Sequence, residues 1–193
     1  MKRMIVATVA SLFLVGACMP TSASDTLPNF AWLDEPEPAP DVLFSVEGGD
    51  MRTLEDYQGK VIVLNFWATW CPPCRDEMPS LDRLEANHGG DDFVVMAMSV
   101  DRGGENQIRE FYDEIAVTSL GVFSDPTQKV SRDFRVLGLP TTIVIDHQGQ
   151  MVARLVGTAE WDGPAALKEL LPLIDAARQA NGGTDQVSLD VNP

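Results

Sequence analysis

The chain has 193 residues, of which 45% are apolar, and its formal net charge is −15. This length suits one domain of ordinary size with terminal segments. The acidic balance argues against nucleic-acid binding and against electrostatic attachment to anionic lipid, and no segment reaches the roughly 18 apolar residues of a spanning helix.

The first residues have the order of an export signal, which predicts a signal peptide or lipoprotein signal over residues 1–23. Lys2 and Arg3 form a basic start, and Met4–Ala17 is an apolar run. Cys18 follows Val-Gly-Ala, which resembles a bacterial lipobox and would make Cys18 the lipidated terminus. Ordinary cleavage near Ala23 and an uncleaved anchor stay open. Each alternative places the domain in an oxidising, extracytoplasmic space. We expect it in the periplasm, anchored to a membrane by a lipid or an N-terminal segment.

Residues 24–40 are acidic and rich in proline, which predicts a semi-extended linker. The folded domain is expected over residues 41–180, followed by a flexible tail over residues 181–193. The turn-forming residues Gly48, Gly49 and Asp50 are flanked by residues 42–44 and 51–53, and this pattern indicates an N-terminal hairpin.

Strands and helices alternate through the rest of the domain, which predicts an α/β fold with a central mixed sheet flanked by helices. A short strand is expected within residues 117–123 and a short helix over residues 125–134. The other expected strands cover 61–67, 93–100, 141–145 and, antiparallel, 151–156. The other expected helices cover 71–88, 105–115 and 162–180.

Cys71 and Cys74 stand between the first of these strands and its helix, separated by two prolines. Unpaired backbone N–H groups and the helix dipole at this position stabilise a thiolate, which is the reactive form of cysteine. One turn later, Cys74 is close enough to attack a mixed disulfide. A structural zinc site needs four ligands, and no second ligand pair accompanies these cysteines. The pair therefore indicates redox chemistry.

Two motifs together carry a family resemblance: the run from Asn65 to Cys74, NFWATWCPPC, and the later run Gly-Leu-Pro-Thr-Thr over residues 138–142. They resemble the thioredoxin superfamily, and more closely the TlpA/ResA/CcmG group of membrane-anchored bacterial thiol-disulfide oxidoreductases. The resemblance covers residues 42–178, and residues 157–161 are similar to the TlpA branch.

The resemblance implies a thioredoxin-like fold in which residues 105–115 form an inserted helix. It implies that Cys71 and Cys74 are catalytic and that Pro140 is cis, so that Leu139 presents its backbone to a client. Trp70 is a further candidate for client binding. No cofactor and no metal are expected beyond the redox-active cysteines.

Thioredoxin carries a buried Asp where this chain has Asn65, and an amide cannot deprotonate the second cysteine. Asp101 and Glu105 follow the next strand and are candidates for that acid/base role, although a solvated loop is the commoner place for such residues. Glu77 is expected in a solvated first turn, where it would favour the helix dipole.

The resemblance favours a reductase that transfers electrons to disulfides of client proteins and is itself reduced by a membrane thiol donor of the DsbD/CcdA type. The implied clients are apocytochrome c or proteins that mature the copper site of cytochrome oxidase. The alternative is a copper-binding maturation chaperone with the same cysteines as ligands. A monomer without nucleic-acid partners is expected.

Overall fold

The computed structural model of the protein describes residues 26–182. The expected signal segment with Cys18, and the expected tail from residue 183 onward, lie outside the described residues. Within that range, no helix is both long enough and apolar enough to cross a membrane.

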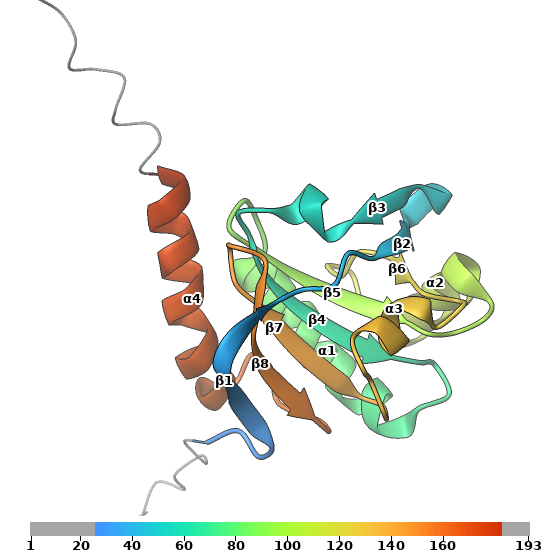
Figure 1. The fold of residues 1–193 in the computed structure, drawn as a ribbon. Helices are drawn as coiled ribbons and strands as arrows, with labels where there is room; N and C mark the ends of the chain where they lie inside the picture. The colour runs from blue at the N-terminus through green and yellow to red at the C-terminus, as the bar shows by residue number, and fades with distance from the viewer. Residues whose placement is uncertain (1–25, 183–193) are drawn as a thin grey trace, which may run out of the picture.

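One eight-stranded mixed sheet forms the centre of the fold, in the order β1-β8-β7-β4-β5-β6-β2-β3 (Figure 1). The strands are β1 (Phe30–Pro38), β2 (Leu43–Val46), β3 (Met51–Thr53), β4 (Val61–Trp67), β5 (Phe93–Ser99), β6 (Phe123–Ser124), β7 (Thr141–Ile145) and β8 (Gln150–Val156). The helices are α1 (Pro72–His88), α2 (Gly104–Ile115), α3 (Lys129–Asp133) and α4 (Pro164–Gly182), with 3₁₀ turns η1 (Glu47–Gly49) and η2 (Leu54–Tyr57). Since α1 packs on β5 and α4 on β4, the expected sheet flanked by helices is confirmed.

Strand β4 is the central strand that positions the cysteines. It pairs in parallel with β5 and antiparallel with β7, and all seven of its residues are buried. A strand covered on both faces has a continuous apolar run, which is why its bounds could be predicted. The chain leaves β4 at Trp67 and enters α1 at Pro72, so the short loop between them holds Cys71 just beyond the end of the central strand.

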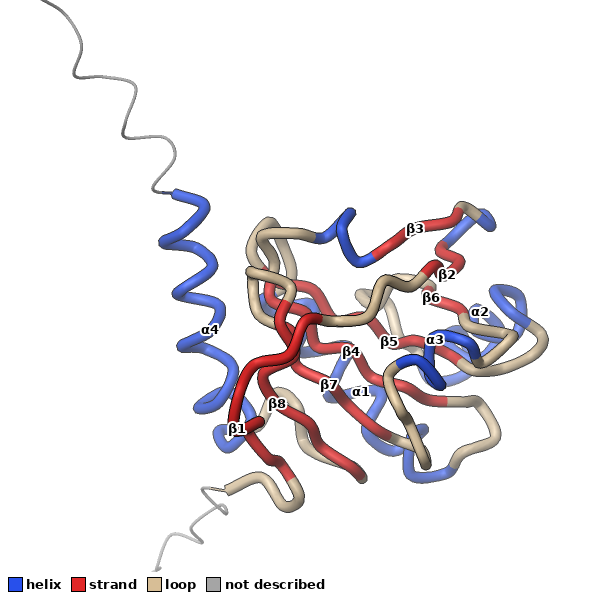
Figure 2. Tube along the Cα trace, viewed as in Figure 1, coloured by secondary structure: helices blue, strands red, loops and turns tan. Residues whose placement is uncertain are grey.

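The expected linker over residues 24–40 is wrong, because most of it forms strand β1. β1 pairs antiparallel with β8, with Phe30 opposite Leu155 and Glu37 opposite Met151, and the two strands run side by side (Figure 2). Its prolines are compatible with this position because an outer strand needs ladder bonds on one side only. The indole N–H of Trp32 also donates a 2.9 Å hydrogen bond to Glu169.

The hairpin of β2 and β3, the helix at residues 105–115 and the antiparallel β7–β8 pair agree with the predictions. Two short elements are smaller than expected: β6 has two residues, and α3 begins only at Lys129. The delay in α3 has a physical cause, since the Asp125 carboxylate accepts hydrogen bonds from the backbone N–H groups of Lys129 and Ser131. Asp125 thereby orders the turn before the helix.

Candidate active site

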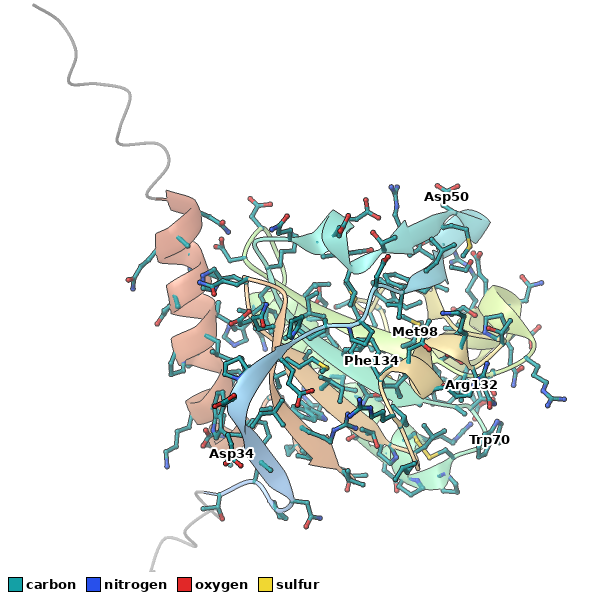
Figure 3. The ribbon with its side chains drawn as sticks, viewed as in Figure 1. Asp34, Asp50, Trp70, Met98, Arg132 and Phe134 are labelled. Atoms are coloured by element: carbon teal, nitrogen blue, oxygen red, sulfur yellow. A yellow bond between two sulfur atoms is a disulfide. The ribbon has the colours of Figure 1, made fainter. Side chains whose placement is uncertain are left out.

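Cys71 and Cys74 form a disulfide at the end of β4, with their Cα atoms 5.3 Å apart. Cys71 is 5% exposed, whereas Cys74 is fully buried. Beside them the Trp70 indole is 66% exposed, at the end of the molecule far from α4 (Figure 3). An incoming disulfide can therefore reach Cys71 before Cys74.

Cys71 occupies the position that caps helix α1. The backbone N–H of Cys74 donates a hydrogen bond to the Cys71 sulfur at 3.4 Å, and two prolines fill the first helical positions. Proline is well tolerated there because those N–H groups have no partner within a helix. When the disulfide is reduced, the same N–H group and the positive end of the helix dipole stabilise a thiolate on Cys71.

The peptide bond between Leu139 and Pro140 is cis, as the resemblance implied. Leu139 and Leu137 line a groove of about 410 Å³ that also contains Trp70 and Cys71. The side chain of Leu137 is fully exposed. The groove therefore brings together Cys71 and two of the residues expected to bind a client, Trp70 and Leu139, whereas Pro140 itself is buried beneath the surface.

Glu77 is a candidate functional residue that was not predicted from the sequence, and its expected solvated position is wrong. Its side chain is 3% exposed, and its carboxylate accepts hydrogen bonds from Asn65 at 2.8 Å, from the Trp161 indole at 3.1 Å and from the Ala159 N–H at 3.2 Å. Burial raises the Glu77 pKa to about 7, although the three hydrogen bonds oppose this rise. A carboxyl with such a pKa can accept and return a proton near neutral pH.

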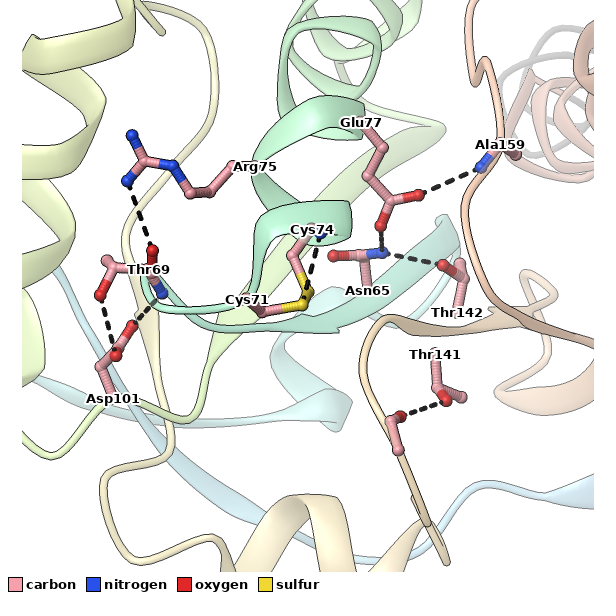
Figure 4. The surroundings of a disulfide bond; sticks show 11 residues. Asn65, Thr69, Cys71, Cys74, Arg75, Glu77, Asp101, Thr141, Thr142 and Ala159 are labelled. Carbon is pink, nitrogen blue, oxygen red and sulfur yellow. Dashed lines mark hydrogen bonds between the residues drawn. A yellow bond between two sulfur atoms is a disulfide. The ribbon is translucent and has the colours of Figure 1, made fainter.

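Glu77 lies one helical turn after Cys74, and residues at this spacing are neighbours on a helix surface. Asn65 on β4 faces the same region, between Cys74 and Thr142 (Figure 4). Its Nδ2 donates to Glu77 and, at 2.9 Å, to the Thr142 hydroxyl. Its Oδ1 is buried and has no partner among residues 26–182. The three-residue spacing from Cys74 places both side chains on the same side of the helix. The burial itself comes from Ala159 and Trp161, which are distant in the sequence.

Asp101, one predicted acid/base residue, is buried and holds the loop before the cysteines. Its carboxylate accepts two hydrogen bonds from Thr69, from the N–H at 2.8 Å and from the hydroxyl at 3.1 Å (Figure 4). It also accepts hydrogen bonds from the Ser99 hydroxyl at 2.8 Å and from Gln107 at 3.1 Å. These four bonds occupy both oxygens. The arrangement indicates a structural role for Asp101 rather than proton transfer.

Glu105, the other predicted acid/base residue, lies on the surface at the start of α2. It accepts hydrogen bonds from Arg109 at 2.8 Å and from the Gly48 N–H at 2.9 Å, and these partners lower its pKa. The structure does not bring it together with the cysteines. Within residues 26–182, no three histidine, cysteine or acidic side chains are grouped so as to hold a metal ion.

The chain is similar to a known protein family and to several characterised proteins. Residues 36–154 match the model of the AhpC/TSA family. The chain is 34% identical to the thioredoxin-like protein YneN of Bacillus subtilis over 65% of this chain and 74% of that protein. It is 32% identical to the thiol-disulfide oxidoreductase ResA of Geobacillus thermodenitrificans, over 81% of this chain and 89% of ResA.

A solved structure gives the same result for the fold. The exposed lipoprotein thioredoxin Etrx1 of Streptococcus pneumoniae superposes with a TM-score of 0.59 and 31% identity, covering 69% of this chain and all of Etrx1. The expected thioredoxin-like fold is therefore confirmed, and so is the resemblance to the ResA group.

Proposed function

The chain belongs to the AhpC/TSA family of thioredoxin-like proteins, and on this premise we propose that it is a thiol-disulfide oxidoreductase that reduces disulfides of client proteins. The observation that carries the proposal is the cysteine pair itself. Cys71 is the accessible cap of α1, and Cys74 is buried beside a carboxyl whose pKa is about 7. These positions give the two cysteines different roles.

The first step is attack by the Cys71 thiolate on a client disulfide. A bond forms between the Cys71 sulfur and one client sulfur, while the client S–S bond breaks and its electron pair leaves on the other client sulfur, which takes a proton from solvent. The positive end of α1 stabilises the Cys71 thiolate before the attack.

The second step releases the client. The Cys74 thiol gives its proton to the Glu77 carboxylate, and the resulting thiolate attacks the Cys71 sulfur. The bond from Cys71 to the client breaks, and the second client sulfur leaves as a thiolate that is then protonated. Two electrons have then moved from the protein to the client, and each client sulfur has taken up one proton. The Cys71–Cys74 disulfide has formed, and the proton of Cys74 is on Glu77 until it is returned to solvent or to the client thiolate.

The N-terminal sequence and the family resemblance also bear on where the protein acts and on its partners. We propose that the protein acts in the periplasm, held by a lipid on Cys18 or by an N-terminal segment, and that a membrane thiol donor of the DsbD/CcdA type re-reduces it. The basic and apolar N-terminal sequence supports export. Apocytochrome c and copper-site maturation proteins are the proposed clients, by the resemblance to the ResA group.

Trapping of the mixed disulfide in cells tests this function. In Cys74→Ser the second step is blocked, so client proteins are expected to remain linked to Cys71 and to be released by a reducing agent. The double variant Cys71→Ser/Cys74→Ser is the matched control and should trap nothing. If Cys74→Ser traps nothing and the wild-type protein does not reduce protein disulfides, the proposal is wrong.

The same cysteines could instead bind copper, and titration with Cu(I) separates the two functions. A copper chaperone would bind one Cu(I) per reduced chain and lose this binding in Cys71→Ser. The reductase proposal expects the redox activity to be lost in that variant without any stoichiometric copper binding by the wild-type protein.

A further inference from the structure

A second hollow of about 440 Å³ adjoins the groove that contains Cys71. Leu137 and Gly138 line both depressions, so this segment is the ridge between them. The ridge is fixed at its base because the Thr141 hydroxyl donates a 2.7 Å hydrogen bond to the Gly138 carbonyl. A polypeptide that crosses the ridge from the cysteines enters the second hollow.

Exposed apolar side chains mark this path. Trp70 borders the first groove, the fully exposed Leu137 stands on the ridge, and Val156, which is 52% exposed, lines the second hollow. Exposed apolar side chains that gather along one path indicate a contact surface. The path therefore offers a contact surface for residues of a client that flank its reactive cysteine.

The two depressions differ in charge. None of the residues that line the first groove is charged, whereas the second hollow contains Arg135, Arg154 and Glu37 and so carries one net positive charge. This is unusual in a chain with a net charge of −15. A local positive charge in an acidic protein would select for an acidic group in whatever binds there.

The two arginines are arranged differently. Arg154 is half-buried and donates a 2.8 Å hydrogen bond to the Phe134 carbonyl, and burial together with the charge of Arg135 lowers its pKa. Arg135 is exposed, and within residues 26–182 its guanidinium forms neither a hydrogen bond nor an ion pair. Arg135 is therefore free to pair with an incoming carboxylate, at a position where Arg154 adds to the attraction.

We infer that the second hollow is a subsite for an acidic side chain of the client, located a few residues from the client's reactive cysteine. The inference rests on the proposed reductase function and names the class of client: an extended, apolar segment with a nearby Asp or Glu. The client cysteine lies against Cys71, the chain crosses the ridge at Leu137, and the carboxylate meets Arg135.

The test uses synthetic disulfide-bonded peptides and the pre-reduced full protein in single turnovers stopped by alkylation. The peptides differ only in one Glu or Lys, placed at successive positions on either side of the cysteine. At one or two positions the wild-type protein should react about three to ten times faster with the Glu peptide, and added salt should reduce this preference. In Arg135→Glu the preference should reverse.

Arg132→Glu is the matched control, because Arg132 is an exposed arginine on the neighbouring helix α3 and lines neither depression. It should keep the wild-type preference. Equal rates with Glu and Lys peptides at every position, or equal effects of the two substitutions, would overturn the subsite while leaving the reductase function intact. Failure to reduce any peptide would overturn both. A concentration-dependent dimer that Arg135→Glu abolishes would assign the surface to a second copy and overturn the inference.

Discussion

The Nδ2 atom of Asn65 donates a 2.8 Å hydrogen bond to Oε1 of Glu77, joining the middle of the central strand β4 to the first helix. This bond fixes the carboxyl one turn beyond Cys74. It also favours the ionised carboxylate, against the opposing effect of burial. The balance of these two effects sets the pKa of Glu77 at about 7, so the carboxyl can gain or lose a proton near neutral pH.

The raised pKa of Glu77 predicts that stability falls as the pH rises. Between the ordinary value of 4.5 and the folded value of about 7, the folded protein holds a proton that the unfolded chain has lost. The free energy of unfolding should therefore decrease through this window by roughly 3 kcal/mol in total. In Glu77→Gln this decrease should disappear.

Urea unfolding of the oxidised protein between pH 4 and 8 measures this effect. Asp76→Asn is the matched control, because Asp76 is the exposed neighbour on the same helical turn and its removal should leave the pH dependence unchanged. Identical pH profiles for wild type and Glu77→Gln would contradict the raised pKa.

Glu77→Gln should also slow the release of the client. The amide of Gln cannot take the proton of Cys74 as the carboxylate can, so the resolution step should slow by about 100-fold, within the usual range for loss of a general base. The mixed disulfide on Cys71 should then accumulate in quenched single turnovers. In the wild-type protein the resolution rate should rise as the pH passes through about 7. An unchanged rate and pH profile in the variant would assign the proton to another acceptor.

Asp101→Asn and Glu105→Gln test the two residues that were predicted from the sequence to have an acid/base role. Asp101→Asn removes acceptors from the buried loop at Thr69 and should lower the free energy of unfolding by about 2 kcal/mol. Glu105→Gln alters an exposed ion pair and should leave the unfolding midpoint unchanged. Neither should change the pH profile of resolution, and a change in that profile for Asp101→Asn would restore it as an acid/base candidate.

Because β1 pairs with β8, we expect residues 26–40 to contribute to the free energy of unfolding. A chain that begins at residue 41 leaves β8 as an outer strand that pairs with β7 alone, and it lacks the hydrogen bond between Trp32 and Glu169. Its free energy of unfolding should be lower by at least about 2 kcal/mol than that of a chain beginning at residue 26, by urea denaturation. Equal stability of the two chains would return this segment to the role of a linker.

The elements that the sequence predicted best are those whose local pattern decides their structure. β4 is apolar except for Asn65, and β7 is a short run rich in β-branched residues, and their predicted bounds agree with the structure to the residue. β1 could not be found in this way because its acidic and proline-rich composition is typical of a linker. Its strand conformation comes from pairing with β8, a partner distant in the sequence.

In the candidate site too, some features could be predicted from local sequence and others could not. The Cys71–Cys74 disulfide and the cis bond before Pro140 could be expected from motifs. The burial of Glu77 could not, because a charged residue near the start of a helix is normally solvated. Here it is covered by residues 159–161, which follow the last strand and supply two of its three hydrogen-bond donors.

The order of the sheet has a consequence for synthesis of the chain. Both outer strands of the sheet, β1 and β3, come from the first part of the domain. The neighbour of β1 is β8, which comes from the last part of the domain. Residue 30 pairs with residue 155, so β1 has no partner until nearly the whole domain has been translated. β1 must therefore stay unpaired until β8 has been made, and closing this distant pair is expected to be the slow part of folding.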